Sequence, residues 1–258
     1  MNRRVVQVGA DGTRREISRQ WVPEAPVALE FNGLAYAVMM ASPRDLEDFA
    51  VGFALAEGLA GRAGDVSEIA VSETEQGWIV RAAVTGLGSE RLTERVRARV
   101  AESSCGLCGI ENLAAVTRPL PPVAGHKAIA PAAIFAALAA LPAQQPLGRA
   151  TGAAHAAAWA SPGGAIGLLR EDVGRHNALD KLLGAMAREG KPASPGFVLS
   201  TARCSYEIVE KAVRGGATTL VSVSLPTSLA VTRAAEAGLS LWALARGDSV
   251  LLVNDAAR

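Results

Sequence analysis

The sequence predicts an α/β protein, with an α+β N-terminal domain followed by a three-layer α/β C-terminal domain. In the second half of the chain, short apolar segments alternate with segments of helical periodicity, which indicates a sheet covered by helices on both faces. In the first half, segments with two-residue alternation are separated by turn residues, which is typical of hairpins. The chain has 258 residues, half of them hydrophobic, and is long enough for one large or two modest domains.

The N-terminal domain is expected to contain a hairpin followed by a helix. Residues 27–36 alternate around Asn32-Gly33, a dipeptide that favours a tight hairpin turn. A helix is expected to follow, with Ser42 as its N-cap and Pro43 in its first turn. Its apolar residues share one face and should pack on the sheet: Leu46, Phe49, Ala50, Phe53 and Ala54. Further strands are expected at residues 5–8, 78–80 and 82–85, and a second helix from residue 89.

The domain boundary is expected near residue 120, because the proline-rich residues 118–122 are typical of a stiff linker. We therefore predict a small α+β domain at residues 1–120 and an α/β domain at residues 121–258. In the second domain we expect a largely parallel sheet. Its expected strands are residues 155–160, 165–173, 197–200, 218–224 and 239–245, with 249–253 as a further edge strand. Its expected helices are residues 131–141, 205–213 and 228–237, and a helix that buries Leu179, Leu182, Leu183 and Met186.

Composition and charge exclude several classes of partner. The net charge of +1 produces no overall field that would attract nucleic acid or a membrane surface. Apolar runs are too short to cross a membrane, and the first residues lack the apolar core of an export signal. The chain has only three cysteines, which favours a reducing compartment with free thiols. We therefore expect a cytoplasmic protein that binds neither nucleic acid nor membrane.

Two of the three cysteines lie in one polar tract. Cys105 and Cys108 form a Cys-x-x-Cys pair flanked by serines and glycines, whereas Cys204 lies far along the chain. Such a pair can bind structural zinc, form a redox disulfide, fill a core, or act as a nucleophile that carries a group such as sulfane sulfur. The chain has no second ligand pair at zinc spacing, and a redox pair usually opens a helix rather than following one. We favour the nucleophilic thiol and keep the other three as alternatives.

Polar residues gather where the expected strands end. Residues 171–177 place five polar or charged side chains between a strand and a helix, at the carboxyl end of a strand, where α/β sheets bind ligands. The strand-end turns 200–203, 224–228 and 244–249 should meet at one edge of the sheet. Their hydroxyl groups, helix N-termini and arginines suit phosphates and a purine base.

Simpler explanations exist for several of these polar residues. Asn177 could serve only as a helix cap, and Asp172 could pair only with Arg175. His155, at the start of an apolar strand, could be an ordinary core histidine. Residues 227 and 228 could be ordinary helix caps. The convergence of several turns is therefore the stronger argument for a site.

The chain resembles the formate dehydrogenase accessory sulfurtransferase family (FdhD). Residues 103–109 are similar to the family's Cys-Gly-x-Cys-Gly signature, and residues 45–53 and 171–181 are similar to two further family motifs. Residues 226–230 and 245–248 match near the C-terminus, so that the resemblance covers nearly the whole chain. Each block alone is weak, but the combination is highly specific.

The resemblance implies a sulfur carrier that accepts sulfur from a cysteine desulfurase as a persulfide. The sulfur is then transferred to the bis-molybdopterin guanine dinucleotide form of the molybdenum cofactor, which formate dehydrogenase needs for activity. The resemblance also implies a homodimer, a C-terminal domain similar to the cytidine deaminase fold, and a site that a guanine nucleotide such as GDP can occupy.

The resemblance also implies roles for individual residues. Cys105 carries the persulfide, Cys108 assists it, and no metal is expected. The residues implied to bind the cofactor are Leu244, Ala245, Arg246, Gly247, Asp248, Ser249, His155, Asp172, Arg175 and His176.

Three positions depart from the family pattern. Ala153 stands where the family tends to have glycine, Thr201-Ala202 where a single glycine is more usual, and Leu244 where phenylalanine is typical. These changes affect close backbone approach to a phosphate and stacking on a base, but not the thiols. A working deaminase is not expected, because His155 is followed by alanines and the His-x-Glu motif is missing. The alternative functions are a cofactor-binding chaperone of formate dehydrogenase without sulfur transfer, and a zinc-dependent or redox protein.

Overall fold

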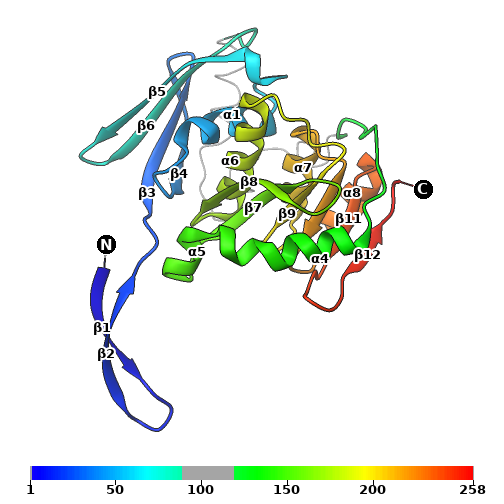
Figure 1. Cartoon of the computed structure of the whole chain (residues 1–258). Helices are drawn as coiled ribbons and strands as arrows, with labels where there is room; N and C mark the ends of the chain where they lie inside the picture. Colours follow the sequence, from blue (N-terminus) through cyan, green and yellow to red (C-terminus); the bar gives the residue numbers. More distant parts are fainter. Residues whose placement is uncertain (1, 89–118, 258) are drawn as a thin grey trace.

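The structure, a computed structural model, describes residues 2–88 and 119–257 (Figure 1). The chain begins with a two-stranded antiparallel ribbon, β1 (Asn2–Val8) and β2 (Arg14–Gln20), which projects away from the body. Strand β1 confirms the strand expected at residues 5–8. Strand β2 lacks a comparable signal in the sequence, because most of its residues are charged or polar and nearly all are exposed.

A four-stranded sheet follows, with strand order β4-β3-β6-β5. Its strands are β3 (Ala25–Phe31), β4 (Leu34–Ala41), β5 (Val66–Thr74) and β6 (Gly77–Val84), and a short 3-10 turn, η1 (Ala63–Asp65), precedes β5. The predicted hairpin is confirmed, because β3 and β4 pair antiparallel around Asn32 and Gly33. Both turn residues have positive φ, at 50° and 78°, as a tight hairpin turn of this type requires.

Helix α1 (Leu46–Ala56) covers this sheet with the apolar face that the sequence predicts. The predicted cap is wrong, because the helix begins later and Asp45 occupies the N-cap position with φ 52°. The Ser42 hydroxyl instead donates to the Pro23 carbonyl at 2.8 Å and accepts from the Val173 amide at 3.1 Å. The Ser42 hydroxyl is therefore used in tertiary hydrogen bonds and does not cap the helix.

The second sheet has six strands in the order β12-β11-β10-β9-β7-β8. Its strands are β7 (His155–Ala160), β8 (Ile166–Asp172), β9 (Phe197–Ser200), β10 (Thr219–Ser222), β11 (Ser240–Ala243) and β12 (Leu251–Asn254). The prediction of a largely parallel sheet is wrong: β9, β10 and β11 run parallel, but β7, β8 and β12 pair antiparallel. The connection between β7 and β8 is too short for a crossover helix, so these two strands form a hairpin.

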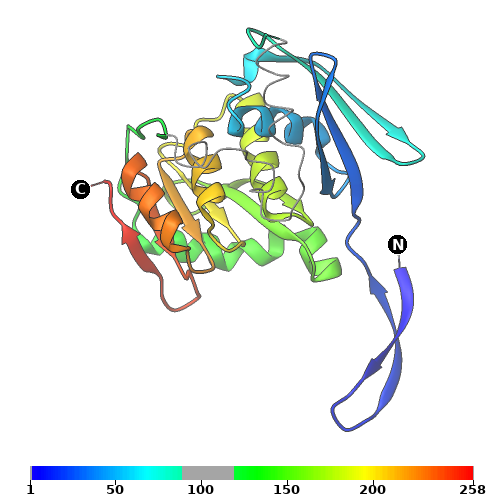
Figure 2. The same ribbon diagram turned by 180° about the vertical axis from the view of Figure 1, so that it is seen from behind.

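Helices cover both faces of this sheet, which confirms the α/β class (Figures 1 and 2). Val198 and Leu220 pack in a core with three helices, whereas their neighbours Leu199 and Val221 point to the opposite face, which α4 covers. On that opposite side lie α4 (Pro131–Ala140), η2 (Leu141–Gln144) and α5 (Pro146–Thr151). The first face carries α6 (Arg175–Arg188), α7 (Tyr206–Arg214) and α8 (Ser228–Ala237). None of the helices in the described ranges is long and apolar enough to span a membrane.

Helix α1 packs tightly against α6 and so joins the two sheets. A Cβ atom at Gly52 would lie 1.7 Å from the Asp180 carbonyl oxygen, and one at Gly184 would lie 1.8 Å from the Asp48 carbonyl oxygen. Only glycine permits this backbone approach. Two of the family-like blocks, residues 45–53 and 171–181, therefore lie against each other. The predicted boundary at residue 120 stays a prediction.

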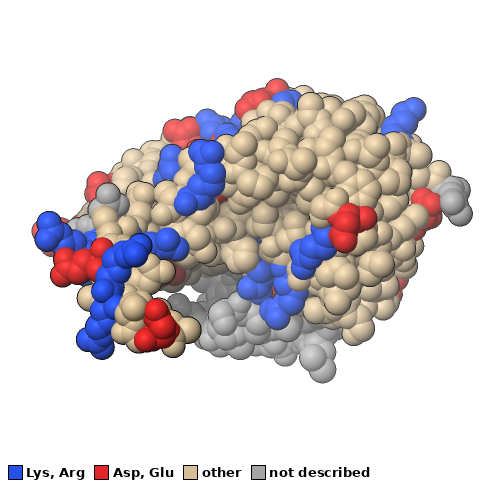
Figure 3. Space-filling view, turned by 60° about the horizontal axis from the view of Figure 1, so that its bottom comes forward, with Lys and Arg blue, Asp and Glu red and all other residues tan. Residues whose placement is uncertain are grey.

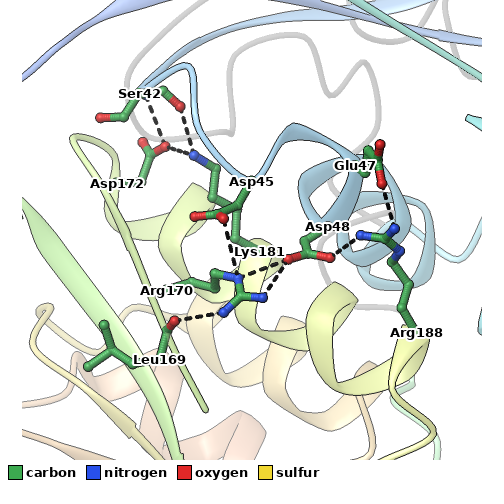
Figure 4. Close-up of polar contacts among 9 residues, drawn as sticks. All are labelled: Ser42, Asp45, Glu47, Asp48, Leu169, Arg170, Asp172, Lys181 and Arg188. Atoms are coloured by element: carbon green, nitrogen blue, oxygen red, sulfur yellow. Dashed lines mark hydrogen bonds and ion pairs between the residues drawn. The ribbon is translucent and has the colours of Figure 1, made fainter. Parts of the chain in front are cut away.

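Ionic contacts reinforce the packing of α1 against the second sheet (Figure 4). The buried carboxylate of Asp48 accepts hydrogen bonds from Arg170 of β8 at 2.8 Å and from Arg188 of α6 at 2.5 Å. Arg188 also contacts Glu47 at 2.5 Å. Because the Asp48 carboxylate is buried between two guanidinium groups, it ties α1 to both β8 and α6.

Candidate binding site at the carboxyl edge of the sheet

The turns that follow β9, β10 and β11 meet at one edge of the six-stranded sheet, as predicted. The Val223 amide, after β10, donates to the Ser200 carbonyl at the end of β9 at 3.0 Å. The Leu244 amide, after β11, donates to the Ser224 carbonyl at 3.2 Å. These hydrogen bonds connect the three turns in strand order. The convergence on which the sequence argument depends is therefore confirmed.

The first two strands of this sheet contribute to the same edge. Because β7 runs antiparallel to β8 and β9, its first residue, His155, lies directly opposite Asp172 at the end of β8. The Ala156 amide donates to the Thr201 hydroxyl, after β9, at 2.8 Å. Arg175 is the first residue of α6 and so follows closely on Asp172. Figure 3 brings the lower side of Figure 1 forward, and blue Lys and Arg side chains stand in the middle of that view.

The imidazole of His155, at this edge, is in its neutral form. Burial lowers the pKa of His155, and the nearby positive charges of Arg175 and His176 lower it further. Asp172 has a smaller, opposite effect on the pKa of His155. Because the pKa starts from 6.5 and moves down, the imidazole of His155 is neutral at pH 7. It can therefore accept one hydrogen bond and donate another at a site where arginine supplies positive charge.

Three polar side-chain atoms among the described residues are buried without a hydrogen-bond partner, and all belong to the start of α6 or α7. They are Nε of Arg175, Nε2 of His176 and Oγ of Ser205. His176 lies 3.2 Å from Glu207, which is an ion-pair distance without the geometry of a hydrogen bond. Ser205 occupies the N-cap of α7 but makes no capping bond. Since buried polar groups in proteins are nearly always paired, Arg175 Nε and Ser205 Oγ are available to a ligand, whereas His176 Nε2 already lies against Glu207.

The turn after β11 has an unusual conformation. Leu244 has φ 49°, in the left-handed region that residues other than glycine rarely adopt. The Arg246 guanidinium donates to the Val223 carbonyl, and the Arg246 amide donates to the Ser249 carbonyl at 2.8 Å. Ala245 is buried. The next four residues of this turn are exposed at the edge of the site: Arg246, Gly247, Asp248 and Ser249.

Asp172 differs from the other residues implied to bind the cofactor, because it is fully buried. Its Oδ2 accepts hydrogen bonds from Lys181 Nζ at 2.5 Å and from the Ser42 amide at 3.0 Å (Figure 4). Its Oδ1 accepts from the Gly174 amide at 2.7 Å and from Asn177 Nδ2 at 3.0 Å. Both carboxylate oxygens therefore have protein partners.

The two simple alternatives for this loop are wrong. The ion-pair partner of Asp172 is Lys181 and not Arg175, because Lys181 reaches the carboxylate from the second turn of α6. Asn177 does not cap α6, whose N-cap is Gly174. The Asn177 side chain instead donates to Asp172 and to the carbonyl of residue 40 in β4.

The predicted catalytic residues, Cys105 and Cys108, lie outside the described residues, and their roles stay predictions. The third cysteine, Cys204, is fully buried beside the site edge. Burial raises the pKa of the Cys204 thiol to about 12. A protonated, inaccessible thiol is a poor nucleophile, so Cys204 is a structural residue.

A cavity of about 400 Å³ lies along β8, away from these turns. Its described lining residues include Arg44, Gln144 and Glu171, but none of the residues implied to bind the cofactor. The Glu171 carboxylate is already used, because it accepts from the Leu147 and Gly148 amides of α5 at 2.8 and 2.7 Å. We therefore place the candidate site at the carboxyl edge and not in this cavity.

Sequence reasoning missed two residues of the site and the partner of a third. Ser205 and Glu207 were expected only as parts of a helix, and their position beside His176 results from the packing of α6 against α7. Lys181 lies in a family-like block, but its burial against Asp172 has no local signal. A lysine four residues after Asn177 on a mainly apolar helix face was the one available hint.

Fold and site define an α/β protein whose sheet edge presents arginine, neutral histidine and unpaired donors. The chain belongs to the FdhD/NarQ family, whose model matches residues 22–258. This finding confirms the resemblance that the sequence motifs indicated.

Individual relatives agree with this assignment. The chain is 46% identical to the sulfur carrier protein FdhD of Variovorax paradoxus over 236 residues, which cover 91% of this chain and 85% of that protein. It is 42% identical to the sulfur carrier protein FdhD of Bordetella bronchiseptica over 231 residues, which cover 90% of this chain and 84% of that protein. A candidate formate dehydrogenase accessory protein from Desulfotalea psychrophila has a similar crystal structure, with a TM-score of 0.78 and 25% identity, covering 100% of this chain and 98% of that one.

Proposed function

We propose that this protein is a cytoplasmic, homodimeric sulfur carrier that serves formate dehydrogenase. It accepts sulfur from a cysteine desulfurase as a persulfide on Cys105 and transfers it to bis-molybdopterin guanine dinucleotide. Membership of the FdhD/NarQ family supports this proposal, as do relatives that bear the name sulfur carrier protein FdhD. The structural neighbour described as a candidate formate dehydrogenase accessory protein supports the choice of enzyme.

The observation that carries the binding part of the proposal is the set of unpaired donors at the sheet edge. Arg175 Nε and Ser205 Oγ are buried donors without partners, and phosphate oxygens are acceptors. The neutral His155 adds a hydrogen-bonding group that carries no charge of its own. Residues 246–249, in the turn after β11, are exposed and therefore accessible to a base and its ribose. The residues present therefore fit the guanine-dinucleotide part of the cofactor.

The sulfur transfer needs two displacement steps. The Cys105 thiolate attacks the outer sulfur of the desulfurase persulfide, a new S–S bond forms on Cys105, and the desulfurase cysteine leaves as a thiolate. In the second step an electron pair of the acceptor attacks this outer sulfur and forms the new bond to it. The electron pair of the broken S–S bond remains on Cys105 as a thiolate, so that the acceptor supplies the two electrons that the transferred sulfur gains. Cys108, three residues further on, assists by holding or relaying the sulfur.

The test is persulfide formation on the intact protein. The protein is incubated with a cysteine desulfurase and cysteine, and mass spectrometry of the peptide with residues 103–109 should show a gain of about 32 Da per sulfur. Cys105→Ala should abolish this gain and fail to activate formate dehydrogenase, whereas the control Cys204→Ala should keep both. Normal activation by Cys105→Ala would refute the persulfide role of Cys105. Absence of the mass gain on this peptide in the unmodified protein would favour the cofactor-binding chaperone that does not transfer sulfur.

A further inference from the structure

We propose that Asp172 is a positioning residue that sets the start of α6, and that Lys181 keeps its carboxylate in place. Through this start the pair orients Arg175 and His176 toward the ligand, without touching the ligand itself. The inference rests on the proposed function, because the ligand considered is the guanine-dinucleotide end of the cofactor. It assigns Asp172 a different role from the direct contact that the family resemblance implies.

Asp172 leaves no carboxylate oxygen free for a ligand, because the residue is buried and both oxygens accept hydrogen bonds. The residue is 0% exposed, and four donors occupy its two carboxylate oxygens. A ligand at the sheet edge would have to displace one of these donors in order to reach the carboxylate. The displaced donor would then be buried without a partner, which is unfavourable.

The loop between β8 and α6 depends on this carboxylate for its shape. Gly174 is the N-cap of α6 and has no side chain to cap the helix, so its amide is held by Asp172 Oδ1 at 2.7 Å. The preceding amide, of Val173, is held by the Ser42 hydroxyl at 3.1 Å. A Cβ atom at Gly174 would lie 2.7 Å from Asn177 Nδ2, which shows how closely the loop is packed. The direction in which the Arg175 side chain projects from α6 is therefore set by buried hydrogen bonds.

Lys181 balances the charge of this network. Its side chain is fully buried, and its ammonium group donates to Asp172 Oδ2 at 2.5 Å and to the Ser42 carbonyl at 2.8 Å. The ammonium group also lies 5.8 Å from the centre of the Phe49 ring. Burial lowers the pKa of Lys181, while the negative charge of Asp172 opposes this change and favours the protonated form. Figure 4 shows how Ser42, Asp172 and Lys181 converge between β4, β8 and α6.

The chain offers a matched control on the same helix. Asp180, the neighbour of Lys181, is also buried and accepts two hydrogen bonds from Lys211 of α7, both at 2.9 Å. This pair resembles the first in burial and chemistry, but it holds α6 against α7 and makes no hydrogen bond to the loop of residues 172–174. Loss of either pair should lower stability, whereas only loss of the Asp172 acceptor should loosen the loop.

The test compares two double variants that each remove both buried charges. Asp172→Asn/Lys181→Met keeps a carbonyl acceptor for the Gly174 amide, and Asp172→Ala/Lys181→Met does not. GDP is the probe, its affinity is measured by calorimetry, and thermal unfolding checks that each variant is folded. We expect the alanine variant to bind GDP about tenfold more weakly than the asparagine variant, which is a difference of about 1.4 kcal/mol. The control Asp180→Asn/Lys211→Met keeps the hydrogen bond between the Gly174 amide and Asp172, so the amides of residues 173–176 should exchange with solvent as in the unmodified protein.

Hydrogen exchange supplies a readout that does not depend on the ligand. The amides of residues 173–176 should exchange faster in Asp172→Ala/Lys181→Met than in Asp172→Asn/Lys181→Met. Should the alanine variant fail to fold, Ser42→Ala replaces it, because this change leaves the charges intact. It removes the acceptor of the Val173 amide together with the hydrogen bond to the Pro23 carbonyl, which lies outside the loop of residues 172–174. Equal GDP affinity and equal exchange in the compared variants would overturn the positioning role. Absence of GDP binding by the unmodified protein would instead contradict the proposed cofactor site, while the exchange measurement still decides the role of Asp172.

Discussion

The crossing of α1 and α6 leads to a sharp prediction for Gly52→Ala. The new methyl group would lie 1.7 Å from the Asp180 carbonyl oxygen, well inside the sum of the van der Waals radii. The blocking atom belongs to a helix backbone and cannot rotate away, so the two helices must separate. Overpacking a core costs about 1–3 kcal/mol, and we expect the upper end here. Alanine recovers about 1 kcal/mol of helix propensity, which leaves a net loss of about 2 kcal/mol.

Thermal and urea unfolding measure this loss directly. For a chain of this size, a loss of about 2 kcal/mol lowers Tm by roughly 4–8 °C. The matched control is Gly64→Ala, because a Cβ atom at Gly64 meets nothing within 4 Å and the φ of Gly64 lies outside the glycine-favouring region. Gly64→Ala should leave Tm unchanged or slightly higher. If Gly52→Ala proved as stable as the unmodified protein, the close helix contact would not be the reason for glycine at this position.

Three further predictions concern single residues of the sheet edge and its surroundings. Arg175→Met should weaken GDP binding about tenfold or more in calorimetry, because a hydrogen bond to a charged group is worth about 1.5–3 kcal/mol. The control Arg188→Met, which removes a partner of Glu47 and Asp48, should leave the GDP affinity unchanged. Equal effects of the two variants would argue against a role of Arg175 in binding. The pKa of His155 is lowered from 6.5 in the folded protein, so the unfolded chain binds the proton more tightly and stability should fall as the pH drops below about 6.5. Urea midpoints measured at several pH values should show a smaller fall in His155→Gln. An identical pH profile in this variant would refute the assignment. Because the pKa of Cys204 is about 12 and the thiol is buried, iodoacetamide should label Cys204 only after unfolding. Rapid labelling of Cys204 itself in the native protein at neutral pH, located by mass spectrometry of its peptide, would contradict this burial.

Much of the fold could be predicted, because it depends on local patterns. The Asn32-Gly33 turn imposes its positive φ angles whatever surrounds it, and the hairpin followed. The apolar face of α6 depends only on spacing, and Leu179, Leu182, Leu183 and Met186 are buried as expected. Strand directions were harder to predict, because parallel and antiparallel pairing bury similar residues and only the length of the connection separates them.

The candidate site divides in the same way. The strand-end turns could be predicted to meet, because ends of neighbouring strands lie at one edge whatever their side chains do. The partners of individual side chains could not, because they come from elements far apart in sequence. The residues that follow Ser42 in the sequence suit a helix that Ser42 would cap. The Ser42 hydroxyl instead accepts a hydrogen bond from the Val173 amide across the interface between the sheets. Such contacts are set by how α1 packs on α6.

The amino-acid sequence alone determined most of the elements, the edge at which the strands end and, through its motifs, the family. Tertiary structure decided which polar groups are used up inside the protein and which are left for a ligand. It places Asp172 in a buried network with Lys181 and leaves Arg175 and Ser205 with unpaired atoms. The physical reason is that a buried polar group must find its partner among whatever groups packing brings within about 3 Å, and local sequence carries no record of that neighbourhood.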